Sequence, residues 1–229
     1  MVAWCPKRAA VTAFSLSCGI TVRWPARLSV LNAAAAAQCV IMDASRLSGL
    51  NAARMLKYDP SDIIVWDFKK ELGGNTPEAI KKARLILWKG YCHVHTNFRP
   101  EHVVEMRTKY PGIKIVVHPE CIPEVVQAAD AFGSTTFIVK YIKEQPAGSI
   151  IAIGTELNLV SRLADEHPDK KILDLSGQTC PICVNMFRTT LADLAFTLDH
   201  LGEVNEIIVE EEIKKDALVA LTRMLQYLN

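Results

Sequence analysis

The chain has 229 residues, half of them apolar and 22% charged, so it can bury a sizeable core as one large domain or as two or three small ones. Its formal net charge of +1 argues against a nucleic-acid partner, which would call for a basic surplus on one face. Because no run reaches about 18 continuous apolar residues, we expect no transmembrane helix and a soluble body. Seven cysteines are too few for a disulfide scaffold, so thiols as metal ligands or catalysts are the better expectation.

Residues 1–42 differ sharply in composition from the rest of the chain. They contain no Asp or Glu but carry Lys7, Arg8, Arg23 and Arg27 among small and apolar residues. This balance is typical of a transit peptide. Two other interpretations stay open: an alanine-rich remnant of a folded domain whose beginning is missing, or a stretch read from a wrong start or out of frame.

From about Gln38 onwards, short apolar runs alternate with helical segments. Repeated β–α units of this kind predict an α/β fold with one parallel sheet or several small ones. The predicted strands are residues 39–42, 63–66, 85–88, 113–117, 150–153, 172–175 and 207–209. The predicted helices span residues 51–57, 157–166, 190–201 and 214–228, and four more begin near residues 76, 100, 123 and 133.

Two predicted strands end in clusters of Cys, His and Glu. The strand at 85–88 is followed by Cys92 with His93 and His95, and the strand at 113–117 by His118, Glu120 and Cys121. Ligands in open α/β folds bind outside the carboxyl ends of parallel strands. We therefore expect both clusters to open onto one site.

Cys180 and Cys183 form a Cys-x-x-Cys pair. Such a pair serves as a redox motif, as half of a zinc site or as part of an iron–sulfur site, and it is also compatible with two small buried apolar residues. The chain has no second pair of this kind, so a metal site would need ligands from different β–α units.

Two further motifs have both a structural and a functional interpretation. His118 and Glu120 combine a group that titrates near neutrality with a carboxylate, which suits proton transfer, although a histidine after a strand is often a satisfied core residue. Ser134 and Thr135 at a helix start would act as an N-cap, worth about 1 kcal/mol, and the same geometry can bind phosphate.

These motifs together resemble the quinolinate synthase A family of the de novo NAD pathway. They occur in the family's order, with family-like gaps, from about Asp62 to the end of the chain. The matching segments are Gly90–His95, Val117–Cys121, Ala129–Asp130 with Gly133–Thr135, Gly154–Glu156, and Cys183–Met186 followed by Thr190–Leu191.

The resemblance implies three small three-layer α/β/α domains with parallel sheets around a pseudo-threefold axis. Residues 1–84 would be a remnant of one domain with a poorly matching start, and residues 85–168 a second domain. Residues 169–229 would be the C-terminal part of the domain whose opening segment is missing. The first domain is thus expected to be incomplete.

The resemblance also implies a transferase that condenses iminosuccinate with dihydroxyacetone phosphate to quinolinate, releasing phosphate and water. Its cofactor would be a [4Fe–4S] cluster with one open iron that acts as a Lewis acid. Cys92 and Cys183 match two cluster ligands, Cys183 being preferred to Cys180 by its spacing from Met186. Cys5 lies about where the third ligand belongs.

Substrate contacts are implied at a further set of positions. Glu120 and His118 match catalytic and substrate-binding residues, and Ser134 and Thr135 match the phosphate-contacting position. Ser48 lies in a Ser-x-x-Asn pattern with Asn51. The family comparison further implies a cytoplasmic protein supplied by L-aspartate oxidase, with no membrane partner.

The chain departs from the family at its front. The family's opening region, with a substrate-binding His and Ser and an active-site Tyr, has no counterpart here, and its Tyr-x-Asn survives only as Leu31-Asn32. We therefore expect a truncated member, with an inactive remnant that still folds as the alternative to an active synthase. In a third interpretation, Cys180 and Cys183 form a dithiol redox switch.

Overall fold

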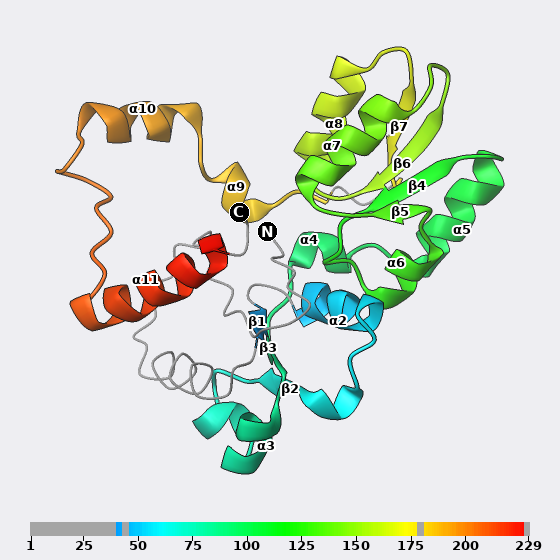
Figure 1. Ribbon diagram of the computed structural model, residues 1–229. Helices are drawn as coiled ribbons and strands as arrows, with labels where there is room; N and C mark the ends of the chain where they lie inside the picture. The colour runs from blue at the N-terminus through cyan, green and yellow to red at the C-terminus, as the bar shows by residue number, and fades with distance from the viewer. Residues whose placement is uncertain (1–39, 43–45, 178–180, 227–229) are drawn as a thin grey trace. The chain divides into compact units, whose positions relative to one another are not determined.

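The computed structural model describes residues 40–42, 46–177 and 181–226 (Figure 1). Strands and helices alternate along them, and every pair of neighbouring strands runs parallel. The predicted α/β class with parallel sheets is therefore confirmed. The described chain forms two compact units, one from residues 46–59, 89–177 and 181–182 and the other from residues 40–42, 60–88 and 183–226. The domain boundaries expected from the sequence stay a prediction.

The first unit is built on a four-stranded sheet with the strand order β5-β4-β6-β7. Its register sets Val117 of β4 opposite Gly154 of β6, so the carboxyl ends of the strands lie at one edge. The strands are β4 (Lys114–Val117), β5 (Ala131–Phe132), β6 (Ile150–Gly154) and β7 (Lys171–Asp174).

Helices cover both faces of this sheet, because successive strand residues point to opposite sides. On one face, Ile115 and Val117 pack with the buried residues of α5 (Pro100–Lys109) and α6 (Pro123–Ala128). On the other face, Val116 packs with α7 (Thr135–Glu144) and α8 (Leu157–Glu166). Figure 1 shows these helices on the two sides of the sheet. The first unit is therefore a three-layer α/β/α sandwich.

Two further helices belong to the first unit. Helix α2 (Arg46–Met55) begins five residues before the predicted helix at 51–57, and it contacts α6. Helix α4 (His93–Thr96) is a single turn that was not predicted, because four residues are too few to show a helical period.

The second unit contains a three-stranded parallel sheet with the order β1-β3-β2. Its central strand is fully apolar and buried at Ile86 and Leu87, as expected for a strand covered on both faces. The elements are β1 (Val40–Met42), η1 (Pro60–Asp62), β2 (Ile63–Trp66), η2 (Glu71–Gly74), α3 (Pro77–Lys82), β3 (Leu85–Trp88), α9 (Val184–Phe187), α10 (Leu191–Asp199) and α11 (Glu211–Gln226).

The predicted strand at residues 207–209 is wrong. Ile207 and Ile208 lie in an irregular segment and are 79% and 84% exposed. A strand is stabilised by the hydrogen bonds and side-chain packing of a neighbour, and no described strand pairs with this segment. The apolar run alone therefore does not make a strand here.

None of the helices that the structure describes is both long and apolar enough to cross a lipid bilayer. This agrees with the absence of a long apolar run in the sequence.

Gly154 ends β6 in a place that has no room for a side chain. A Cβ at this position would lie 2.8 Å from Cγ1 of Val117 and 3.1 Å from Cδ2 of Leu175. Because Val117 and Leu175 are fully buried, neither side chain can move into solvent. The absence of a side chain at Gly154 therefore keeps β4 and β6 in register at the edge where the polar clusters lie.

We expect Gly154→Ala to lower the free energy of unfolding by about 1–3 kcal/mol, the usual cost of overpacking a core. The penalty should shrink in a Val117→Ala background, which removes the methyl group nearest to the new Cβ. Urea unfolding of the four proteins in this cycle measures both values. An equal penalty in the two backgrounds would show that the Val117 contact is not its cause.

Candidate functional site

The two polar clusters predicted to share a site meet at the carboxyl edge of the first unit. One ligand atom each from Cys92, His95 and Glu120 lie within 4.8 Å of one another. Cys92 is the N-cap residue of α4, which carries His95 one turn further on, and Glu120 follows β4. The expectation that both clusters open onto one site is confirmed.

His95 is the central residue of this cluster. Its Nδ1 lies 3.2 Å from Oε2 of Glu120, and its Nε2 lies 3.2 Å from Oγ1 of Thr155, the residue that follows β6. Its ring stacks on that of His118, with centroids 4.3 Å apart and planes at 11°. The imidazole is thus held in its plane and at both nitrogens.

The loop that carries Glu120 is fixed by a buried amide. Nδ2 of Asn51 donates hydrogen bonds to the carbonyl oxygens of Pro119, at 2.9 Å, and Cys121, at 3.1 Å. The backbone N–H of Glu120 donates to Nδ1 of His118 at 3.3 Å. Since Asn51 is only 4% exposed, helix α2 holds the loop from within the protein.

The hydrogen bonds among Cys92, His95 and Glu120 favour the charged form of each side chain. Burial alone would lower the pKa of His95, but hydrogen bonds to Cys92 and Glu120, and their charges, outweigh it and raise this pKa to about 9. Burial opposes ionisation of Cys92 and Glu120 as well, yet the hydrogen bonds from His95 lower the pKa of both groups. His95 is therefore an imidazolium at neutral pH, the carboxylate form of Glu120 is favoured, and Cys92 carries a larger share of thiolate than an ordinary cysteine.

The pKa of His118 is shifted in the opposite direction to that of His95. Burial and the positive charge of His95 outweigh the attraction of Glu120 and lower the pKa of His118 to about 4. This imidazole is therefore neutral at physiological pH. The site combines a charged histidine, which can donate a proton, with a neutral one.

The two thiols near the site differ in what they can do. Cys92 is partly exposed and has a lowered pKa, which makes its sulfur suited to bind a metal. Cys121 is fully buried, its Sγ–H donates to the carbonyl oxygen of Gly154 at 3.5 Å, and burial raises its pKa. Cys121 is thus a packed core residue.

Cys92 and Cys183 have the same local backbone. Each is the N-cap of a one-turn helix, α4 or α9, with φ/ψ angles of −87°/118° and −79°/107°. Both side chains are half-buried, and the carbonyl oxygen of each accepts the first helical hydrogen bond. In these respects both thiols suit a soft metal group such as an iron–sulfur cluster. Cys5 and Cys180 lie outside the described residues.

The predicted substrate contacts have clear structural positions, although their roles stay predictions. Ser134 is the N-cap of α7, where its Oγ accepts the N–H of Phe137 at 3.3 Å, and both Ser134 and Thr135 are exposed. The N-cap interpretation of Ser134 is confirmed. Ser48 is 7% exposed and lies one turn before Asn51 on α2.

The metal and substrate contacts implied by the family resemblance do not include His95, Thr155 or Asn51, which the structure brings to the cluster. One signal was available for His95, because Cys-x-x-His spacing brings two ligand side chains to the same side of a helical turn. Thr155 and Asn51 stood in recognised motifs, but their hydrogen bonds to residues far along the chain have no sequence signature.

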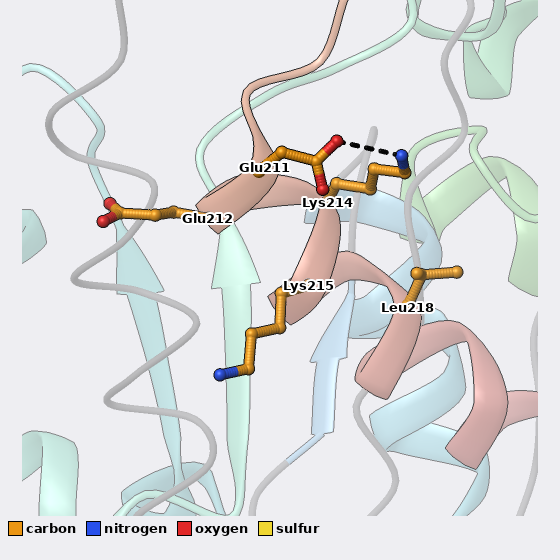
Figure 2. A pocket seen from close by; sticks show the side chains of 5 residues that line it. All are labelled: Glu211, Glu212, Lys214, Lys215 and Leu218. Atoms are coloured by element: carbon orange, nitrogen blue, oxygen red, sulfur yellow. Dashed lines mark hydrogen bonds and ion pairs between the residues drawn. The ribbon is translucent and has the colours of Figure 1, made fainter.

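A shallow hollow in the second unit lies along α11 and is shown in Figure 2. It is lined by Glu211, Glu212, Lys214, Lys215 and Leu218. Nζ of Lys214 lies 3.0 Å from Oε1 of Glu211, while Glu212 and Lys215 extend away from this pair. These side chains come from one helix and are largely exposed, so the hollow is a solvated helix face.

Comparisons with known proteins agree with the motifs. Residues 24–226 match the family model described as quinolinate synthetase A protein (NadA). The chain is 50% identical over 181 residues to a quinolinate synthase of Rhodopirellula baltica, covering 77% of this chain and 46% of the relative. It is 46% identical over 167 residues to one of Herpetosiphon aurantiacus, covering 72% and 44%. It is 45% identical over 184 residues to one of Acidobacterium capsulatum, covering 78% and 49%. The chain thus spans about half the length of these relatives.

The contrast between the two thiols leads to a test with iodoacetamide. We expect Cys92 to be alkylated at pH 7 faster than an ordinary thiol, whose pKa is about 8.5, because a larger share of it is thiolate. Cys121 should react only after unfolding. His95→Gln should slow alkylation of Cys92 several-fold, and His93→Gln should not. Peptide mass spectrometry after timed quenching measures these rates, and equal rates for Cys92 and Cys121 would contradict the assignment.

The lowered pKa of His118 leads to a pH dependence of stability. Between pH 6.5 and 4, the unfolded chain protonates this imidazole and the folded protein does not, so stability is lost as the pH falls. His118→Gln should make this loss smaller by about 1.4 kcal/mol per pH unit. Urea unfolding of the wild type and the variant at several pH values in this range provides the measurement, and parallel curves would show that His118 is not the cause.

Proposed function

The chain belongs to the quinolinate synthetase A family, and on that premise we propose that it acts in the condensation of iminosuccinate with dihydroxyacetone phosphate to quinolinate. The observation that carries this proposal is the convergence of Cys92, His95 and Glu120 at the carboxyl edge of the sheet. It brings a thiol suited to bind a metal together with groups that can donate and accept protons. The reaction would release phosphate and water and would contribute to NAD biosynthesis.

We propose Cys92, Cys183 and Cys5 as the thiolate ligands of a [4Fe–4S] cluster. The shared backbone of Cys92 and Cys183 supports the first two ligands. When bound, the cluster would supply an open iron that polarises a substrate oxygen as a Lewis acid.

Protein side chains would carry out the proton transfers of the reaction. The Glu120 carboxylate can act as a base, and the His95 imidazolium, whose Nδ1 faces Oε2 of Glu120, can pass its proton to that carboxylate, so the pair can both accept and supply a proton. The neutral ring of His118, stacked on His95, adds a polar surface without a further charge. Dehydration needs both removal of a proton from carbon and protonation of a leaving oxygen, and this pair of groups suits both steps.

Two other groups are proposed to hold the substrates. Ser134 and Thr135 at the start of α7 would contact the phosphate, because exposed N–H groups and hydroxyls at a helix N-terminus favour an anion. Ser48 is proposed as a further contact from α2. Holding two reactants in register in this way can lower a barrier by several kcal/mol.

We also propose a domain arrangement, a cellular location and a source of substrate. Three small domains around a pseudo-threefold axis, with boundaries near residues 84 and 168, would each provide one cluster ligand from an equivalent turn. We propose a cytoplasmic protein that receives iminosuccinate from L-aspartate oxidase.

We expect anaerobic reconstitution with iron and sulfide to give a brown protein in the wild type and in Cys121→Ser, but not in Cys92→Ser or Cys183→Ser, because thiolates retain the iron. Iron and sulfide analysis measures the cluster, and an anaerobic assay of quinolinate measures turnover. Equal iron loss from all three variants would contradict the ligand assignment. A cluster with turnover supports the synthase, and a cluster without turnover would contradict the proposed activity of this chain.

A further inference from the structure

We propose that Cys92, His95 and Glu120 form a binding site for a single divalent metal ion such as Zn²⁺ in protein that carries no cluster. The site lies within the first unit and needs neither Cys183 nor Cys5. It shares Cys92 with the proposed cluster, so the ion and the cluster exclude each other, but it does not depend on the proposed synthase activity.

The positions of the three side chains suit a zinc ion. Zinc is bound by sulfur, nitrogen and oxygen at about 2.0–2.3 Å, so neighbouring ligand atoms lie about 3.3–3.7 Å apart in a tetrahedron. The ligand atoms of the three residues lie within 4.8 Å of one another, and the distance from His95 Nδ1 to Glu120 Oε2 is 3.2 Å. Small side-chain rotations bring all three atoms to such an ion.

The second ring nitrogen of His95 has the partner that a metal-binding histidine requires. With Nδ1 on the metal, Nε2 carries the proton and donates it to Oγ1 of Thr155 at 3.2 Å. The His118 ring stacked on His95 holds the plane of the imidazole. The histidine is therefore oriented toward Cys92 and Glu120 before any ion binds.

Nearby donors have other partners, which limits the site to three protein ligands. The Cys121 thiol donates to the Gly154 carbonyl, and Nδ1 of His118 accepts the N–H of Glu120. The fourth position of a tetrahedral ion would thus be taken by water. One thiolate and one carboxylate balance the two charges of the ion, which keeps a partly buried site neutral.

The test begins with metal-free, reduced full-length chain, which is titrated with Co²⁺. Binding of Co²⁺ to a thiolate gives a charge-transfer band in the near ultraviolet. Zn²⁺ is then added to compete with the bound Co²⁺. We expect one equivalent of Co²⁺ to give this band and one equivalent of Zn²⁺ to remove it. Cys92→Ser should abolish the band. His95→Gln and Glu120→Gln should weaken metal binding at least tenfold. Thr155→Val, which keeps the shape of the side chain, should weaken it about 10–100-fold.

Matched controls come from neighbouring residues of the same type. His93→Gln and Glu124→Gln should bind the metal as the wild type does, because His93 Nε2 faces the carbonyl oxygen of Ile182 and Glu124 is exposed on α6. Circular dichroism of each variant checks that it is folded. Wild-type affinity in His95→Gln and Glu120→Gln would overturn the site and leave Cys92 as a lone thiol ligand.

Cys183→Ser separates this inference from the proposed function. This variant should lose the reconstituted cluster yet keep the single-ion site, whereas His95→Gln should keep all the proposed cluster thiolates and lose the single-ion site. Loss of Co²⁺ binding in Cys183→Ser would overturn the three-residue site. Failure of cluster reconstitution in the wild type would count against the cluster alone.

Discussion

The hydrogen bonds of one buried imidazole organise the candidate site. His95 lies between the Glu120 carboxylate and the Thr155 hydroxyl, and it is also hydrogen-bonded to the Cys92 thiol. These partners follow three separate strands of the chain, so their positions depend on the register of the sheets and on the turn at α4. The low exposure of His95, 8%, strengthens these contacts, because a charge-assisted hydrogen bond gains strength where water is excluded.

Much of the fold could be predicted from the sequence, because its strands are short apolar runs with clear ends. The strands at 63–66 and 85–88 and the helix at 157–166 were predicted at their observed bounds. The one-turn helix α4 and the two-residue strand β5 were missed, because neither a single helical turn nor two strand residues show a repeating pattern. The apolar run at 207–209 misled the prediction, since strand formation depends on a neighbour that local sequence does not specify.

Part of the candidate site was predicted, because some of its residues follow a strand in the sequence. Cys92, His118 and Glu120 were found because polar groups directly after buried strands have a known meaning in α/β folds. The roles of Thr155 and Asn51 come from contacts with residues 60 and 68–70 positions away, which only the folded chain creates. Cys121 is not among the predicted cluster ligands, and in the structure it is fully buried with its thiol bonded to the Gly154 carbonyl oxygen.

The irregular segment after α10 has a consequence for the behaviour of the isolated chain in solution. Ile207 and Ile208 expose most of their surface, as do Leu191 and Leu201 nearby in sequence. An apolar stretch with no strand partner among the described residues offers its backbone to strand addition by another molecule, which natural edge strands block with charges or proline. Here the carboxylates of Glu206 and of Glu210, Glu211 and Glu212 flank the stretch, so they oppose such addition at low ionic strength and oppose it less as added salt screens their charges.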